Sequence, residues 1–307
     1  MMEEINLQDS YIALYANIEV AQATRDNLDA SIDVICASIT HHAQIHLQTN
    51  ELTLWLKNQD KSVPVGDKLT QMLSYWCQQS VKPCILFINE IDALVGDTLV
   101  SVLRQIRSGY AMRPSAFVQS IVLCGVRDVR DYRIHTKGGI ITGGSAFNIK
   151  SESLRMGNFT LDEIKALYQQ HTDATGQEFE LSIYDELWQD TQGQPWLVNA
   201  LAYQVCWKAK ENRDRNKAIT LETYKAAREV LIFARTTHLD QLSDKLKEPR
   251  VHAVIAPMLA THDAFPETHT SIDHLQYVED LGLIKLKPQL AISNLIYQEV
   301  IPRELGF

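Results

Sequence analysis

The stretch Ile85-Leu-Phe-Ile-Asn-Glu-Ile-Asp92 decides the fold class of this chain. It continues an apolar run that begins at Pro83, and such runs are typical of parallel strands that are buried on both faces. The run ends in Asn89 and Glu90, an amide and a carboxylate. Ligands of open α/β sheets bind outside the carboxyl ends of the strands, so these two side chains are candidate site residues.

Segments on both sides of this stretch alternate between strand and helix patterns. Three further short apolar segments predict strands, at 11–17, 120–124 and 146–149. Apolar residues that recur at helical spacing predict helices at 28–39, 67–76 and 97–106. Strands that are separated by helices indicate an α/β fold with a parallel sheet.

From Thr160 onward the pattern changes to helices only. Thr160-Leu-Asp-Glu163 is a capping box, in which each end residue satisfies a backbone amide of the other. Gly176 is a plausible stop for that helix, and Pro195 suits the first turn of the next. Thr220 is placed to cap a further long helix.

The last segment, from about Asp240, has the pattern of a winged helix. A helix around Val251–Met258 and a second helix that stops at Gly282 precede two short apolar segments, which predict a hairpin. We therefore expect three domains, namely an α/β core at 1–158, a helical lid at 159–238 and a winged-helix domain at 239–307.

Composition and charge are those of an ordinary globular chain, with 45% hydrophobic and 22% charged residues and a net charge of −9. The acidic balance disfavours broad, non-specific binding of nucleic acid, although it allows one local basic face. No apolar run approaches the length of a membrane span, and the first ten residues do not resemble a signal peptide. We expect no membrane partner.

The cysteines and histidines predict neither disulfides nor a metal site. The five cysteines include no C-x-x-C pair, which indicates a reducing, cytoplasmic setting. His41, His42 and His46 form the densest histidine group. Without a nearby cysteine or a clear carboxylate partner, they are interpreted as part of a helix surface rather than as metal ligands.

With Asn89-Glu-Ile-Asp92 at the tip of a buried strand, the sequence resembles the AAA-like ATPases of prokaryotes, near the branch that includes the signalling STAND-type NTPases. The resemblance covers nearly the whole chain and implies ATP and magnesium as ligands. It places Glu90 at the catalytic glutamate and Asp92 within the family's D-E-I-D pattern. Asn89 stands where the family has its magnesium-supporting aspartate; an uncharged amide would hold magnesium only through a water molecule.

The resemblance also implies roles for residues elsewhere in the chain. Arg127 falls at the sensor position, which contacts the terminal phosphate in the family; the alternative is that it forms surface ion pairs with neighbouring acidic residues. Gly193-Gln-Pro195 resembles the Gly-x-Pro element of STAND-type lids, where a helix start approaches the nucleotide. The alternative for Gly193 and Pro195 is a plain turn and helix cap.

The sequence contains no match to the phosphate loop G-x-x-x-x-G-K-[ST]. The nearest segment, Gly138–Ser145, has Gly144 in place of the lysine and is predicted to be a flexible loop. Only ten residues precede the predicted strand at 11–17. We therefore expect the family's first strand, phosphate loop and following helix to be absent, which leaves an incomplete P-loop-type sheet.

These observations favour an ATPase-family protein with weak or no hydrolysis by this chain alone. The alternative is a non-catalytic scaffold that binds a protein partner or associates with itself. A DNA-binding regulator is the weakest hypothesis, because residues 241–307 carry six Lys or Arg against nine Asp or Glu. The predicted helix at 271–281 has no Lys or Arg, whereas a DNA-reading helix normally lies on a basic face. We therefore expect no nucleic-acid partner.

Overall fold

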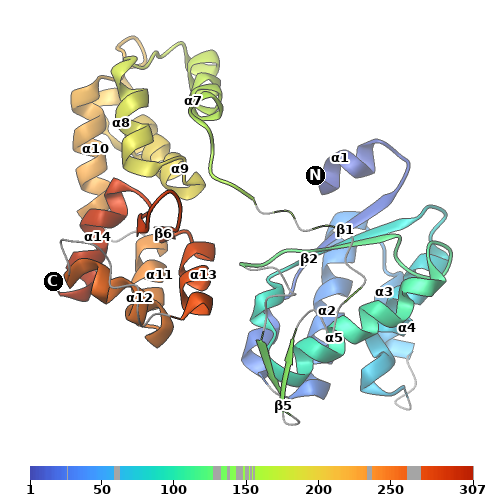
Figure 1. The fold of residues 1–307 in the computed structure, drawn as a ribbon. Coiled ribbons are helices and arrows are strands. Elements are labelled where there is room, and N and C mark those ends of the chain that lie inside the picture. Colours follow the sequence, from blue (N-terminus) through green and yellow to red (C-terminus); the bar gives the residue numbers. More distant parts are fainter. Residues whose placement is uncertain are drawn as a thin grey trace. The chain divides into compact units, whose positions relative to one another are not determined.

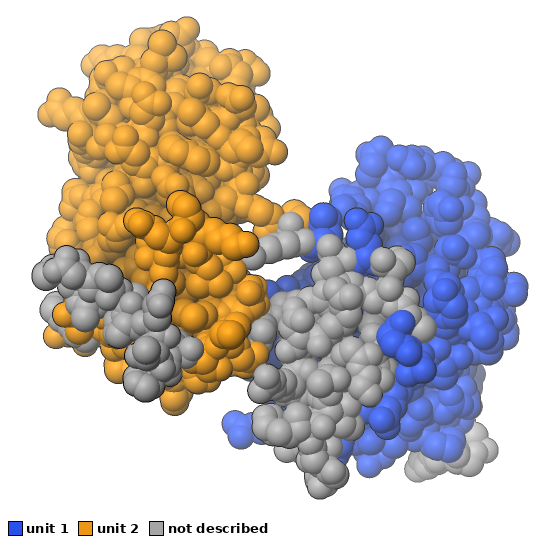
Figure 2. All heavy atoms as spheres, in the orientation of Figure 1, with its two compact units in different colours: residues 1–154 blue, residues 155–307 orange. Residues whose placement is uncertain are grey.

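The computed structural model describes residues 1–25, 27–58, 63–126, 133–136, 139–142, 148, 152, 154, 156–233, 237–260 and 271–306. Contacts divide the chain into two compact units, Met1–Leu154 and Arg155–Phe307 (Figure 2). Each unit has its own cluster of buried apolar side chains, so each is described by itself.

The first unit is built on a parallel sheet with the strand order β1-β2-β3 (Figure 1). The strands are β1 (Ile12–Asn17), β2 (Cys84–Asn89) and β3 (Ser120–Leu123). Both pairings are parallel, and Asn17 lies opposite Asn89 at the carboxyl end. This confirms the predicted parallel α/β sheet, with its buried apolar run in the central strand.

Helices pack against this sheet through the apolar positions that the sequence predicted. The unit contains α1 (Met2–Leu7), η1 (Glu19–Thr24), α2 (Leu28–Leu47), α3 (Glu51–Asn58), α4 (Val65–Gln79), η2 (Ile91–Ala93), α5 (Gly96–Gly109) and η3 (Tyr110–Met112). Leu86 and Ile88 of β2 are fully buried in one core with side chains from α2, α4 and α5. Full burial of such a side chain contributes about 1.5–3 kcal/mol.

The helix predicted at 97–106 is confirmed as α5, with a start one residue earlier. The helix begins at Gly96, and no side chain caps its amino end. Thr98 is buried, and its hydroxyl instead donates to the carbonyl of Arg25 at 3.3 Å. A buried hydroxyl bonds to the partner that the core offers, which a local capping pattern does not reveal.

A small antiparallel hairpin follows the sheet, made of β4 (Arg133–Thr136) and β5 (Gly139–Thr142). The prediction of a flexible loop over Gly138–Ser145 is therefore wrong for Gly139–Thr142. The β-branched residues Ile140-Ile-Thr142 favour a paired strand, which outweighs the glycines around them. The strand predicted at 146–149 lies outside the described residues, apart from Asn148.

Side chains from α1 and α2 close the outer edge of β1. The amide of Asn6 donates to the carbonyl of Ala13 at 3.0 Å and accepts from its N–H at 2.7 Å, as a neighbouring strand would. At the carboxyl end, the Asn17 carbonyl accepts from the Ser38 hydroxyl, and the Asn17 N–H donates to Nε2 of His42 at 3.2 Å. These contacts satisfy backbone groups that would otherwise form an open strand edge.

The second unit is helical, with one short hairpin near its end (Figure 1). Its elements are α7 (Leu161–Thr175), α8 (Ser182–Thr191), α9 (Pro195–Tyr203), the π-helical turn η5 (Gln204–Lys208), η6 (Lys210–Arg213), α10 (Leu221–Phe233), α11 (Thr237–Leu246), α12 (Pro249–Ala260), α13 (Ile272–Asp280), β6 (Ile284–Lys285), β7 (Ala291–Ile292) and α14 (Leu295–Leu305). The capping box of Thr160 and Glu163 is confirmed, as is Gly176 at the end of α7, with a φ of 74°. Pro195 is the first residue of α9, as predicted.

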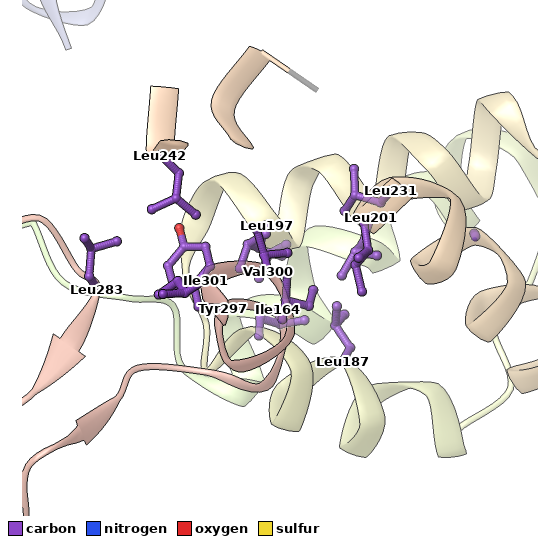
Figure 3. Close-up of a cluster of buried hydrophobic side chains, with 14 of the residues drawn as sticks. Ile164, Leu187, Leu197, Leu201, Leu231, Leu242, Leu283, Tyr297, Val300 and Ile301 are labelled. Atoms are coloured by element: carbon purple, nitrogen blue, oxygen red, sulfur yellow. The ribbon is translucent and has the colours of Figure 1, made fainter. Parts of the chain in front are cut away.

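The predicted hairpin is confirmed by the antiparallel pairing of β6 with β7, in which Ile284 lies opposite Ile292. One apolar core then runs from α7 to α14. Figure 3 shows Leu197 of α9, Leu242 of α11 and Tyr297 of α14 among its side chains. The predicted boundary between lid and winged helix, at 238/239, thus falls within a continuous core.

A buried ion-pair network joins three helices of this unit. Arg228 of α10 pairs with Asp190 of α8 at 2.8 Å and with Glu299 of α14. The Tyr224 hydroxyl donates to the second oxygen of Asp190 at 2.8 Å. Burial raises the pKa of Asp190, while Arg228 and Tyr224 act in the opposite direction. The carboxylate therefore depends on these partners for its charge.

The structure also shows the state of the cysteines and the apolar character of the helices. All five cysteines are unpaired, in agreement with the absence of a disulfide pattern. Among the described residues, no helix combines the length and the apolar character that are needed to cross a bilayer.

Replacement of Asn6 by alanine should destabilise the first unit, because the Ala13 amide and carbonyl both lose their partner. We expect a loss of about 1–2 kcal/mol in the free energy of unfolding. Urea denaturation, together with hydrogen exchange of the Ala13 amide, measures it. Gln8→Ala, at an exposed position just after α1, is the control. If the Ala13 amide exchanges its hydrogen as slowly in Asn6→Ala as in wild type, other groups close the edge of β1.

Acid should weaken the first unit through His42. Its pKa is lowered by burial and then by His46 and His41, so the unfolded chain binds its proton more readily. The stabilisation is therefore complete above the unfolded pKa of about 6.5 and is lost as the pH falls through the lower folded value. Denaturation at about pH 5 and about pH 7.5 should show a smaller pH dependence in His42→Gln than in wild type. The exposed His252→Gln is the control, and equal pH dependence in all three proteins would contradict the assignment.

Replacement of Arg228 by methionine should cost the second unit about 3–5 kcal/mol, because it leaves the buried Asp190 carboxylate without its cation. The double variant Asp190→Asn/Arg228→Met should recover part of that loss. Chemical denaturation measures both, and Lys247→Met, in an exposed pair with Asp244, should change little. Equal losses in the single and double variants would mean that the arginine acts through packing alone.

Candidate functional site at the tip of the central strand

The backbone fixes the tip of β2 between its two neighbours. The carbonyl of Asn89 accepts from the N–H of Ile18, just beyond β1, at 3.2 Å. On the other side, the N–H of Cys124 donates to the Ile88 carbonyl at 2.8 Å, and the N–H of Ile91 donates to the Cys124 carbonyl at 3.1 Å. Glu90 therefore projects from a segment that is bonded on both sides.

Glu90 itself adopts a left-handed backbone conformation, with φ 62° and ψ 44°. A residue with a side chain pays of order 1 kcal/mol for this region, and such conformations cluster at active sites and ligand clamps. The turn η2 follows at once, with the Ala93 N–H donating to the Glu90 carbonyl at 3.0 Å. The strand therefore ends in a sharp turn at Glu90, whose side chain is half-buried.

Asp92 and Gly125 meet closely beside this turn. A Cβ atom at Gly125 would lie 2.6 Å from Oδ1 of Asp92 and 2.8 Å from Cγ2 of Ile91, so only glycine fits without a shift. Oδ1 of Asp92 is buried and has no hydrogen-bond partner within the described part of the chain. A buried carboxylate oxygen without a donor is costly, which makes it a candidate contact for a bound cation or water.

Among the described residues, the groups that shift the pKa of Glu90 are acidic. The pKa of Glu90 is raised, first by partial burial, then by Asp92 and then by Glu19. Glu90 therefore holds a proton more readily than a free glutamate does. The described residues contain no group of three or more His, Cys, Asp and Glu side chains that would hold a metal. A role of Asn89 or Asp92 toward magnesium therefore stays a prediction.

The structure does not test the remaining predicted site residues at this strand tip. Arg127 is outside the described residues. Gly193 and Pro195 belong to the second unit, where Gly193 has a φ of 74° and a Cβ atom would lie 1.9 Å from the carbonyl oxygen of Phe159. Gly193 is therefore required by this backbone contact, and Pro195 opens α9 beside the capping side chain of Gln194. Their role toward a nucleotide stays a prediction.

Sequence reasoning missed the residues that position the end of β1. Asn17, Ser38 and His42 form the polar connection between β1 and α2. The available signal was the polar residue Asn17 at the end of an apolar strand, in the same register as Asn89. The histidines do lie on a helix, as predicted, but His42 has a structural partner in β1.

Comparisons with known proteins identify the fold. No family model and no curated protein matches the chain. Among solved structures, a Walker-type ATPase of Pyrococcus abyssi is similar at 12% identity, with a TM-score of 0.59, over 94% of this chain and 83% of that one. The RuvB branch migration motor of Thermotoga maritima matches at 14% identity over 100% and 91% of the two chains, but with a TM-score of only 0.41. Cdc6p of Pyrobaculum aerophilum matches at 14% identity over 97% and 80%, with a TM-score of 0.42. On the first of these likenesses, the chain has the α/β fold of Walker-type, P-loop ATPases.

Proposed function

We propose that this chain is an ATPase-family protein whose strand-end residues Asn89, Glu90 and Asp92 are directed at a nucleotide, and that it hydrolyses ATP weakly or not at all by itself. One observation carries the proposal. Glu90 is held in a left-handed turn at the carboxyl end of the central parallel strand, where ligands bind in this class of sheet. The raised pKa of its carboxyl group suits a residue that accepts a proton from water.

Each acidic or amide group at the tip has a distinct part in this proposal. Glu90 orients the attacking water and takes its proton. Asp92 and Asn89 face the metal region, Asn89 through a water molecule because its amide carries no charge. Magnesium, when bound, would neutralise negative charge on the phosphates. Arg127 is the proposed contact to the terminal phosphate.

Weak activity follows from the missing phosphate cradle. The sequence has no G-x-x-x-x-G-K-[ST] segment, and the residues nearest to that pattern include β5, which is paired with β4. Without a lysine and a nest of backbone N–H groups, magnesium and the proposed Arg127 contact are left to offset the repulsion between a triphosphate and the carboxylates of Glu19, Glu90 and Asp92. The chain alone should therefore bind a nucleotide poorly.

The second unit extends the proposal to a STAND-like arrangement. Helices α7 to α10 would form a lid, with Gly193 and Pro195 at the start of α9, and the segment from α11 to β7 would form a winged helix. The order of three helices followed by a hairpin supports this assignment. Domain boundaries near 158 and 238 complete the proposal.

A non-catalytic scaffold is the second candidate function. Helix α13 carries Asp273, Glu279 and Asp280 without a Lys or Arg, which suits contact with a protein better than contact with DNA at this helix. A scaffold would show partner binding or self-association that is indifferent to ATP.

Nucleotide titration of the purified chain tests the proposal. We expect magnesium–ATP to bind with a Kd of about 1 mM, or about −4 kcal/mol, and turnover to stay near background. Glu90→Gln should bind magnesium–ATP at least about twofold more tightly than wild type, because the substitution removes one negative charge near the phosphates. Calorimetry and phosphate release measure these quantities, with Glu222→Gln at the exposed start of α10 as the control.

Two results would reject the proposal. A clear ATPase rate that vanishes in Glu90→Gln would show that the chain is a competent enzyme by itself. No detectable binding at several times the expected Kd, with wild type and Glu90→Gln alike, would favour the scaffold.

A further inference from the structure

The second unit has an aromatic pocket that the proposed ATPase function does not use. It lies where α9 runs into the π-helical turn η5 and has a volume of 240 Å³. Its walls come from His171, Asn199, Ala202, Tyr203, Cys206 and Trp207. Pockets for whole drug-sized ligands start at about 300 Å³, so this one suits a single flat group of a larger ligand.

Two aromatic rings border this pocket and remain largely in water. Tyr203 is 54% exposed and Trp207 is 60% exposed. They are four residues apart, at the end of α9 and in η5. Single π-helical turns occur frequently at functional sites, and an exposed pair of large rings beside a hollow is typical of a recognition surface.

Cations stand over both rings. Nζ of Lys208 lies 5.5 Å from the centre of the Tyr203 ring, and Cζ of Arg215 lies 5.1 Å from the centre of the Trp207 ring. Arg215 is anchored, since its Nη1 donates to Oε1 of Gln177 at 2.6 Å and to the Cys206 carbonyl at 3.0 Å. Arg215 is therefore held in place over the Trp207 ring.

The local charge is opposite to that of the whole chain. Residues 203–217 carry five cationic side chains and two acidic ones, a net charge of +3, whereas the chain carries −9. The cationic residues are Lys208, Lys210, Arg213, Arg215 and Lys217. Asp214 pairs with Lys217 at 3.7 Å. Lys208, Lys210 and Arg213 are exposed in the segment that directly follows the two rings.

We propose that the surface formed by Tyr203, Trp207 and the cations of 208–217 binds single-stranded nucleic acid. Bases would stack on the ring faces that Lys208 and Arg215 do not cover, with one base entering the pocket, and the phosphates would lie along Lys208, Lys210 and Arg213. Aromatic platforms inside a positively charged groove are the means by which proteins hold unpaired strands, whether RNA or DNA. The net charge of the whole chain predicted no nucleic-acid partner. However, the electrostatic potential that a ligand meets is set by the charges within one Debye length, which is about 8 Å.

Other occupants fit the surface less well. An acidic peptide would satisfy the cations but would bring no flat ring for a pocket of this size. An anionic membrane would require apolar side chains that insert together, whereas here each ring lies beneath a cation. A second copy of this acidic chain would complement only the positive charge of the surface. Each of these occupants is an outcome of the test below.

Fluorescence anisotropy of labelled oligonucleotides, with the full chain, tests the proposal. Labelled dT20 and U20 should both bind, with a log–log salt slope of about −2 for three phosphate contacts. Trp207→Ala should weaken binding at least fivefold, as the loss of one stacked base predicts, whereas Trp207→Phe should retain most of it. Lys208→Gln/Lys210→Gln should reduce the salt slope by about 1.4.

Phe233→Ala is the matched control, because Phe233 is 69% exposed and also lies beneath an arginine, Arg303 at 5.1 Å. It should bind as wild type does. Equal loss in Phe233→Ala, or no loss in Trp207→Ala, would overturn the proposal. So would failure to bind dT20 and U20 at low salt. A stronger Trp207-dependent response to an acidic peptide, to anionic phosphatidylserine vesicles or to increasing protein concentration would instead assign the surface to that occupant.

Discussion

The central strand β2 is the constraint on which the rest of the first unit depends. It is hydrogen-bonded along both edges, and Leu86, Phe87 and Ile88 are buried although they alternate between its two faces. A one-residue slip would exchange the side chains of two differently packed faces and shift both ladders, so the register is strongly determined. For this reason the polar residues that follow the strand have a fixed starting point, and the left-handed turn at Glu90 can be maintained against its conformational cost.

The parts of the fold that sequence predicted well are those determined by local apolar periodicity. The helices around Ile35, Leu73 and Leu103 and the three parallel strands are long enough for their pattern to outweigh competing preferences. The parts that sequence missed depend on pairings that apolar periodicity does not reveal, even where the partners are near in sequence. Asn6 lies only seven residues from Ala13, and β5 pairs with the strand directly before it, but neither a polar side chain nor a glycine-rich segment carries a periodic mark of its partner.

The same distinction applies to the candidate site. Asn89 and Glu90 could be placed at a strand tip because an apolar run that ends in polar residues defines its own carboxyl end. The role of Asn17 could not be predicted from the sequence, since its contacts to Ser38 and His42 span more than twenty residues. Gly125 was also missed as a packing residue, because the reason for a glycine there is the approach of Asp92 from another segment.

The tip of β2 and the Tyr203–Trp207 surface are both proposed to bind phosphate groups, but the charges around them differ. At the tip of β2, burial and the neighbouring carboxylates disfavour the ionised form of Glu90, so a phosphate would need a cation or a donor loop to approach. At the Tyr203–Trp207 surface the local charge is positive, and Arg215 is already held in place by Gln177 and Cys206. Arg215 and the Trp207 ring beneath it therefore need little further ordering when a polyanion binds to the neighbouring Lys208, Lys210 and Arg213. The chain by itself is therefore better prepared to hold the phosphates of a nucleic-acid strand at the second unit than those of a nucleotide at the first.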